Sequence, residues 1–271
     1  MPDSATQGLQ NIATAAQAIN RLYDERMYNQ LVDEYYGGSR FLNFGYWEDH
    51  IRSPREASEN LLSRLLSFIA EKKGAILDVA CGTGATTRFL LNFYAPDQVT
   101  GINISTKQLE TCRQVAPGCR FLEMDAVNLQ FPDSTFDAII CVEAVFHFRT
   151  REKFLKEACR VLKDGGTLVL SDALISKVGK EQRPHFPEEN FVERLEDYRQ
   201  LYRQAGFQTV EIEDATRQSW ESSFWQVIHF AYGKFLIGAI DADQLYTFLD
   251  RIYRLTADLR YYVLVKAEKG F

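Results

Sequence analysis

The chain alternates between short apolar runs and longer segments whose apolar residues recur at helical spacing. Runs of four to seven apolar or β-branched residues bounded by turn residues predict strands. The predicted strands lie at residues 75–80, 98–102, 120–124, 136–142, 167–172, 207–212 and 261–266. Amphipathic helices fill most of the segments between them. This alternation predicts an α/β fold with a doubly wound, mostly parallel, seven-stranded sheet.

Helical spacing also marks the segments on either side of the sheet. A stripe of apolar residues predicts helix within residues 8–36, in two parts that end at Gly37-Gly38: Leu9, Ile12, Ala16, Ile19 and Tyr23, then Met27, Leu31 and Tyr35. Ser53 before Pro54 is a strong start for the next helix. Further helices are predicted at 84–94, 105–116, 151–162 and 190–205, with two more within 218–258, joined near residues 238–243.

These elements divide the chain into three predicted parts. Residues 1–54 form a helical and aromatic cover, 55–175 the α/β core, and 176–271 a lid, cap helices and the last strands in one structural unit with the core. Residues 176–189 are polar and contain proline, which is typical of a loop or lid. The late helices interrupt the alternation, so we expect them to cap the active edge of the sheet.

Composition narrows the class of protein. The 271 residues suit one large domain, 46% hydrophobic, with a net charge of -6 and no long Lys/Arg run, which disfavours nucleic-acid or anionic-membrane partners. No apolar run is long enough for membrane insertion, and the N-terminus lacks a signal pattern. Five cysteines without a C-x-x-C pair fit a reducing cytosol. We therefore expect a cytoplasmic monomer or homodimer.

The stretch from Ala75 to Thr87 predicts a strand, a glycine-bearing turn and the start of a helix. Such a turn lets a ligand approach bare backbone at a helix N-terminus. A dinucleotide fingerprint would need a third glycine where Thr87 stands and an acid at the end of the next strand, where Asn103 stands. Both departures argue against NAD.

The run Leu77-Asp78-Val79-Ala80-Cys81-Gly82-Thr83-Gly84 resembles the first motif of class I S-adenosylmethionine-dependent methyltransferases, with alanine in place of the first glycine. The resemblance extends over residues 41–173 and is to the small-molecule branch, which acts on natural products, quinones and lipids. It implies a Rossmann-like methyltransferase fold, S-adenosylmethionine as cofactor and S-adenosylhomocysteine as product.

The resemblance also implies a set of cofactor-binding residues. Those at or near strand ends are Asp78, Ala80, Gly82, Gly84, Asn103, Ile104, Gln108, Asp125, Ala126 and Glu143. Asn103 and Gln108 would share the ribose, Asp125 and Ala126 would meet the adenine, and Glu143 the methionine moiety. Hydroxyls of Tyr23 and Tyr46 in the cover would bind the methionine carboxylate.

Several of these residues could instead have a purely structural role. Asp78 could cap the following helix, Ser105-x-x-Gln108 is also a capping box, and Asp125 could be an ordinary loop aspartate.

For catalysis, the resemblance indicates His147 and Asp172. His147 follows a predicted strand, and a histidine can accept a proton near neutral pH. The alternative is a half-buried histidine packed between Phe146 and Phe148. Asp172 ends the next strand and would orient His147 or bind the acceptor. No metal-ligand spacing is present.

The predicted function is methyl transfer by in-line displacement to a small, largely apolar acceptor, at a hydroxyl or carboxylate oxygen, with His147 as base. Transfer to nitrogen or carbon stays open, and a non-catalytic cofactor-binding protein is a distant alternative. Nucleic-acid methylation is disfavoured, because the chain lacks a basic patch and the N/D-P-P-[YF] signature.

Overall fold

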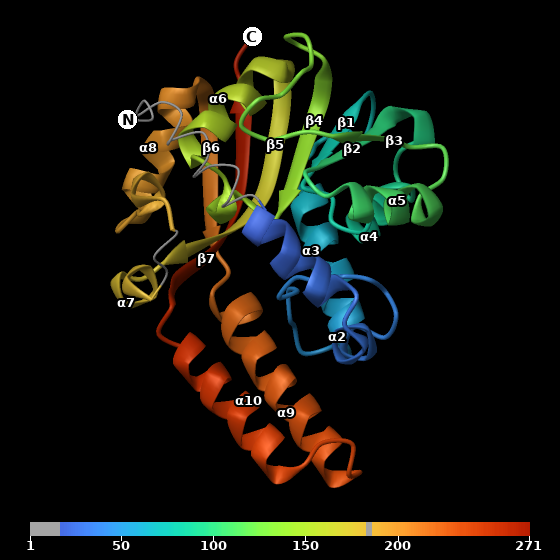
Figure 1. Cartoon of the computed structure of the whole chain (residues 1–271). Coiled ribbons are helices and arrows are strands. Elements are labelled where there is room, and N and C mark those ends of the chain that lie inside the picture. The colour runs from blue at the N-terminus through green and yellow to red at the C-terminus, as the bar shows by residue number, and fades with distance from the viewer. Residues whose placement is uncertain (1–16, 183–185) are drawn as a thin grey trace, which may run out of the picture.

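The computed structural model describes residues 17–182 and 186–271. Within them the chain forms one seven-stranded sheet in the order β3-β2-β1-β4-β5-β7-β6 (Figure 1). β7 runs antiparallel to both of its neighbours, and every other neighbouring pair is parallel, which confirms the predicted doubly wound fold. The strands are β1 (Ile76–Val79), β2 (Val99–Asn103), β3 (Arg120–Glu123), β4 (Phe136–Val142), β5 (Leu162–Ile175), β6 (Phe207–Asp214) and β7 (Leu259–Lys269).

The helices follow the predicted order with changed ends, except that residues 177–181 are helical where 176–189 were predicted as a loop or lid. The Ser176 side chain caps this helix by accepting from the Gly179 amide at 3.0 Å. The helices are one over 17–27, α2 (Gln30–Tyr35), α3 (Pro54–Ser67), α4 (Ala85–Leu90), α5 (Thr106–Val115), α6 (Arg151–Val161), α7 (Lys177–Glu181), α8 (Leu195–Ala205), α9 (Ser222–Leu236) and α10 (Ala242–Leu255). α3 begins as predicted, with the Ser53 side chain accepting from the Glu56 amide at 3.2 Å. The predicted helical residues Leu9, Ile12 and Ala16 lie outside the described residues.

Two boundaries differ from the prediction for clear reasons. The first helix includes Met27, and Asn29 separates it from α2 because its side chain accepts from the amides of Leu31 and Val32. β5 extends beyond the predicted 167–172 at both ends. Leu162 pairs with Phe136 of β4, and the antiparallel pairing with β7 continues to Ile175.

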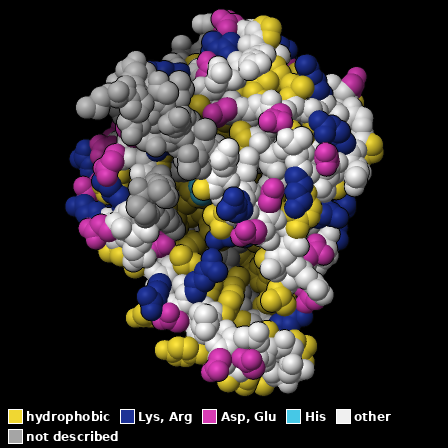
Figure 2. All heavy atoms as spheres, viewed as in Figure 1, with side chains coloured by type: hydrophobic (Ala, Val, Ile, Leu, Met, Phe, Trp, Pro, Cys, Tyr) yellow, Lys and Arg dark blue, Asp and Glu magenta, His cyan; other side chains and the backbone are white. Residues whose placement is uncertain are grey.

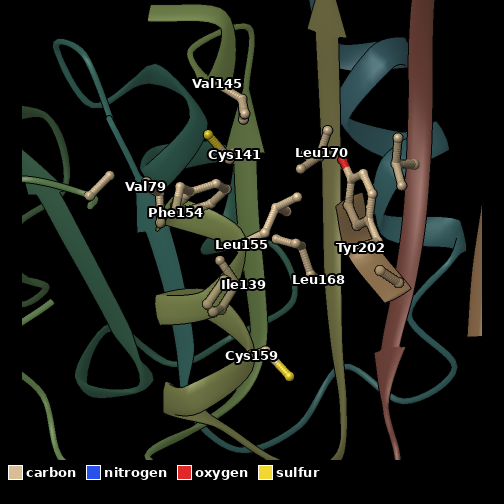
Figure 3. Close-up of a cluster of buried hydrophobic side chains, with 14 of the residues drawn as sticks. Val79, Ile139, Cys141, Val145, Phe154, Leu155, Cys159, Leu168, Leu170 and Tyr202 are labelled. Carbon is tan, nitrogen blue, oxygen red and sulfur yellow. The ribbon is translucent and has the colours of Figure 1, made fainter. Parts of the chain in front are cut away.

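Successive residues of the central strands pack on opposite faces of the sheet. Ile139 and Cys141 of β4 pack with Phe154 of α6 (Figure 3), whereas Ala138 and Ile140 belong to the core on the opposite face, with residues of α3 and α4. A parallel sheet must be covered on both faces, and these helices exclude water from both. The frame that carries the strand ends is therefore rigid.

The aromatic loop after α2 is packed rather than exposed. Phe41 and Trp47 are buried, at 7% and 9% exposure, and the Trp47 amide donates to the Gln218 carbonyl at 2.8 Å. The Phe44 ring meets Trp220 edge-on. The segment 217–221 thus closes over the loop and removes the cost of exposing its rings.

The helix 17–27 and the α9–α10 hairpin lie on the side of the sheet where the parallel strands end (Figure 1). The hairpin projects away from the sheet. The hairpin contacts α2 through the Tyr35 and Phe230 rings and through a Lys234–Glu34 ion pair. Leu236 and Ile237 at its tip are 80% and 75% exposed. In Figure 2, hydrophobic side chains gather in the hollow above this hairpin.

Candidate active site

The strand order reverses between β1 and β4, since β1 continues to β2 on one side and β4 lies on the other. Ligands of open α/β sheets bind outside the carboxyl ends of the strands at such a point. Here the turn 80–84 follows β1 and the segment 143–147 follows β4, so the fold brings together the two segments that the sequence singled out.

The turn has the conformation that glycine favours. Gly82 and Gly84 have φ values of 55° and 90°, and a Cβ at Gly82 would lie 2.9 Å from the Met27 methyl group. A Cβ at Gly84 would lie 3.1 Å from the Cα of Cys112 in α5. Ala80 has φ 57°, a left-handed conformation that costs an L-residue about 1–2 kcal/mol. The motif's alanine thus occupies a position that suits glycine.

Asp78 lies beneath the turn and is buried. Its Oδ2 accepts from the Thr87 hydroxyl of α4 at 2.6 Å. Burial raises the pKa of Asp78 to about 7, against a smaller lowering by the Thr87 hydrogen bond. The carboxylate bonds to a side chain of the helix rather than capping its amides, and it fixes the helix beneath the turn.

Asn103 and Gln108 form one hydrogen-bonded chain. Asn103 Nδ2 donates to the Gly82 carbonyl at 3.2 Å and to Gln108 Oε1 at 2.8 Å. Gln108 Nε2 donates to Asp24 Oδ1 at 2.7 Å. Only half of the capping box forms: the Gln108 amide donates to Ser105 Oγ at 3.3 Å, while the Gln108 side chain turns to Asn103 and Asp24 instead of the Ser105 amide.

Ile104, Asp125 and Ala126 lie at the ends of β2 and β3. The Ile104 carbonyl accepts from Asn20 Nδ2 at 3.0 Å. Asp125 is exposed, and its Oδ1 accepts from the Val127 amide at 3.1 Å, as in an ordinary loop aspartate, while Oδ2 bonds to none of the described residues. Ala126 is buried.

Glu143 joins three parts of the site. Its Oε1 accepts from the Phe44 amide at 2.7 Å and from the Tyr262 hydroxyl at 2.6 Å. Burial raises the pKa of Glu143 to about 8, against smaller lowering by these two hydrogen bonds. The acid therefore ties the aromatic loop and β7 to the end of β4.

His147 ends a short 3₁₀-helix after β4, and its Nε2 lies 2.7 Å from the Tyr23 hydroxyl of the helix 17–27. The two rings meet edge-on at 5.3 Å between centroids. The Phe146 ring lies against the imidazole at 4.2 Å. The structure thus brings together a predicted cover residue and the predicted base.

Two predicted site residues point elsewhere. Asp172 is fully buried, and both of its oxygens pair with the Arg151 guanidinium, at 2.7 Å and 3.2 Å. The Tyr198 hydroxyl also donates to it at 2.8 Å, so the carboxylate does not bond to His147. The Tyr46 hydroxyl donates to Glu213 of β6 at 3.2 Å rather than to the turn.

Two contacts were not assigned from the sequence. The Asp24 carboxylate meets Gln108, and the Tyr262 hydroxyl meets Glu143. Asp24 follows Tyr23 in the cover, but nothing local indicates which strand end it reaches. Tyr262 lies in an apolar strand pattern that reads as core. The site contacts of both residues become visible only in the folded structure.

The site fits S-adenosylmethionine. Gly82 leaves backbone bare at the start of α4, where dipoles and free amides favour a ligand carboxylate. Asp125 Oδ2 bonds to none of the described residues and can take the adenine amino group, and the Ala126 amide beside it donates to none of them. Between cover and turn, next to Met27 and Val142, the remaining space is about 50 Å³. Ligand pockets usually exceed about 300 Å³, so the cover must shift to admit the cofactor.

Comparison with known proteins agrees with the geometry. Residues 77–170 match the family described as "Methyltransferase domain". The chain is 32% identical to 27-O-demethylrifamycin SV methyltransferase of Amycolatopsis mediterranei, over 74% of this chain and 79% of that protein. It is also 32% identical to O-methyltransferase cnsE of Penicillium expansum, over 72% and 74% of the two chains. Among solved structures, the [4+2]-cyclase SpnF matches with a TM-score of 0.73 at 22% identity, covering 94% of this chain and 97% of that one.

Fold and site together define a class I S-adenosylmethionine-dependent methyltransferase. The chain belongs to this family and uses S-adenosylmethionine as its cofactor. Its homologues are small-molecule methyltransferases. Within 17–182 and 186–271, no helix is long and apolar enough to cross a membrane, and no cluster of three metal-ligating side chains occurs.

Proposed function

We propose that this methyltransferase acts on an oxygen of a small, largely apolar acceptor, with His147 as the base. The observation that carries the proposal is the 2.7 Å contact between His147 Nε2 and the Tyr23 hydroxyl, at the end of β4 and next to the cofactor turn. The names of the rifamycin and cnsE relatives, which are O-methyl transferases, support oxygen as the target.

The chain's own residues would align the reactants and move one proton. When bound, S-adenosylmethionine supplies a methyl group that its positively charged sulfur activates for displacement. The Tyr23 hydroxyl would accept the acceptor's proton and pass its own to His147 Nε2. The oxygen–carbon bond forms as the carbon–sulfur bond breaks, so the proton ends on the imidazole. A carboxylate acceptor arrives ionised and would need alignment only.

An apolar acceptor fits the surroundings of the base. Phe146 packs on the His147 ring, and the neighbouring Phe148 is half-buried. In α9, Trp225 is 60% exposed, and Phe230 meets Tyr35 of the cover. Rings at this edge would hold an extended apolar molecule and keep water from the transfer.

The division into a cover (1–54), a cofactor-binding core (55–175) and a C-terminal part (176–271) belongs to the same proposal. The cover would close on the cofactor through Tyr23. The Tyr46 hydroxyl could meet the methionine carboxylate only after leaving Glu213. We infer that Tyr46 positions the aromatic loop, since its amide also donates to the Ala57 carbonyl at 2.8 Å.

The test is methyl transfer by His147→Asn and Tyr23→Phe to hydroxyl- and carboxyl-bearing apolar compounds, with products identified by a mass gain of one CH₂. His147→Asn should lower kcat by about 10²–10⁴-fold and leave the affinity for S-adenosylhomocysteine within twofold. His229→Asn, on the exposed side of α9, is the matched control. An unchanged kcat in His147→Asn would show that His147 is not the base. Methylation at nitrogen or carbon only would show that the acceptor atom is not oxygen.

A further inference from the structure

The ribose end of the cofactor site lacks the expected carboxylate. In doubly wound sheets an acid at the end of the second strand accepts from ribose hydroxyls, and here that position is Asn103. Both polar atoms of the Asn103 side-chain amide already make hydrogen bonds within the protein. Nδ2 donates to Gly82 and Gln108, and Oδ1 accepts from the amides of Ile104 and Ser105 at 2.8 Å and 3.4 Å. Asn103 therefore shapes the loop and has no acceptor left for a ribose.

A carboxylate from elsewhere in the chain lies close to this position. Asp24, on the helix 17–27, accepts through Oδ1 from Gln108 Nε2 at 2.7 Å and from Ser105 Oγ at 3.0 Å. One side chain, Gln108, separates it from Asn103. Its second oxygen, Oδ2, makes no hydrogen bond within the part of the chain that the structure describes.

The Asp24 carboxylate is also reachable. The residue is half-buried, and it lines a groove of about 630 Å³ between the helix 17–27 and Lys107 at the start of α5. Its neighbour Asn20, one helical turn earlier, bonds to the Ile104 carbonyl at 3.0 Å. The Tyr28 hydroxyl, one turn later, lies 2.7 Å from Thr111. These contacts hold the Asp24 face of the helix against the ends of β2 and α5.

We propose that Asp24 binds the ribose hydroxyls of S-adenosylmethionine and so supplies, from the cover helix, the acceptor that Asn103 lacks. The two vicinal hydroxyls are donors, and an ionised carboxylate is the side chain best suited to accept from both. Gln108 Nε2 keeps Oδ1 in place, which leaves Oδ2 for the ribose. The inference rests on the cofactor and not on the proposed acceptor or base.

The assignment gives the cover helix two functions on adjacent residues. Tyr23 meets the base His147, while Asp24 meets the ribose end through Gln108. Successive residues of a helix point about 100° apart, so one helix can reach both ends of the site. Cofactor binding and docking of the helix then strengthen each other.

The test is calorimetric binding of S-adenosylhomocysteine and of its 2′,3′-dideoxy analogue to wild type and to Asp24→Asn. The asparagine keeps Oδ1 as acceptor for Gln108 and Ser105, so the helix can still dock, and it replaces only Oδ2 by a donor. Circular dichroism and the midpoint of thermal unfolding check that the variant is folded. Glu25→Gln is the matched control, because Glu25 is the exposed neighbour on the same helix.

We expect Asp24→Asn to weaken S-adenosylhomocysteine binding by about tenfold to a hundredfold, as for a lost hydrogen bond to a charged group. Binding of the dideoxy analogue, already weak, should change less than twofold, and Glu25→Gln should change neither. An equal loss of affinity for both ligands would mean that Asp24 only docks the helix. No loss of affinity for either ligand would show that Asp24 does not take part in cofactor binding. Both results would overturn the proposal. Binding needs no acceptor, so failure of the His147 proposal would leave this result intact.

Discussion

Asp172 lies at the end of a strand, as a catalytic acid would, yet its surroundings make it a structural residue. It is 0% exposed and faces Arg151, which is 1% exposed, while the Arg151 Nη2 atom also donates to the Ala173 carbonyl at 2.9 Å. A buried charge is strongly destabilising unless an opposite charge lies beside it, so each of these two residues depends on the other. The role of this acid is therefore to hold the start of α6 against β5 near His147.

Replacing Asp172 by asparagine should lower stability more than it alters chemistry. The variant leaves the Arg151 guanidinium buried without an opposite charge, which costs about 3–5 kcal/mol of unfolding free energy in urea denaturation. Asp133→Asn is the control, since Asp133 is 75% exposed in its pair with Arg160 and should cost less than about 1 kcal/mol. A variant as stable as wild type but slow in methyl transfer would return Asp172 to the catalytic residues.

At the scale of elements, Glu143 is the point where the aromatic loop, β4 and β7 meet. Its carboxyl accepts from Phe44 and Tyr262, and burial raises its pKa to about 8 from the ordinary 4.5 of a free glutamate. Between those two pH values the folded protein holds a proton that the unfolded chain releases. Stability therefore falls as pH rises from about 4.5 to about 8 and then levels off.

Glu143→Gln should remove this pH dependence. Glutamine still offers Oε1 to Phe44 and Tyr262 but cannot ionise. In urea denaturation at pH 5.5 and pH 9, the unfolding free energy of the wild type should fall by on the order of 3 kcal/mol more than that of the variant. Glu110→Gln, an exposed change on α5, should follow wild type. Parallel losses in wild type and Glu143→Gln would show that this carboxyl ionises freely in the folded protein.

Most elements were predictable because their signals are local. Seven strands, the glycine turn and the Ser53 cap each follow from residues within a few positions of one another. The helical region 8–36 was predicted in two parts but with Met27 in the second one, and Asn29 was not recognised as the break, although asparagine is a known cap. The C-terminal extension of β5 depends on β7, which lies far along the chain.

The grouping of the candidate site's segments was predictable from the sequence, but the hydrogen-bond partners of its side chains were not. Strand ends and the reversal of strand order brought the turn to the segment of His147, as a doubly wound sheet requires. The partners of Asp172 and Tyr46 were not predictable, since Arg151 and Glu213 lie 21 and 167 residues away from them. A single sequence carries no signal for such pairs.

For the molecule as a whole, the helix 17–27 lies over the edge of the sheet where the parallel strands end (Figure 1). The hairpin of α9 and α10 extends the same edge away from the sheet (Figure 1). The turn 80–84 lies between the cover, β1 and α5: a Cβ at Gly82 would meet Met27 of the cover, and the Gly82 carbonyl accepts from Cys112 Sγ of α5 at 3.2 Å. We expect the cofactor to bind across this turn.

Calorimetric titration with S-adenosylhomocysteine tests that claim most directly. Wild type should bind one molecule per chain and show no binding of NAD. Gly82→Val, whose side chain would meet Met27 at a backbone φ of 55°, should stay folded and lose the binding. Gly233→Ala, at an open position of α9, should bind as wild type does. Absence of binding in wild type, or undiminished binding in Gly82→Val, would show that the cofactor does not bind across this turn.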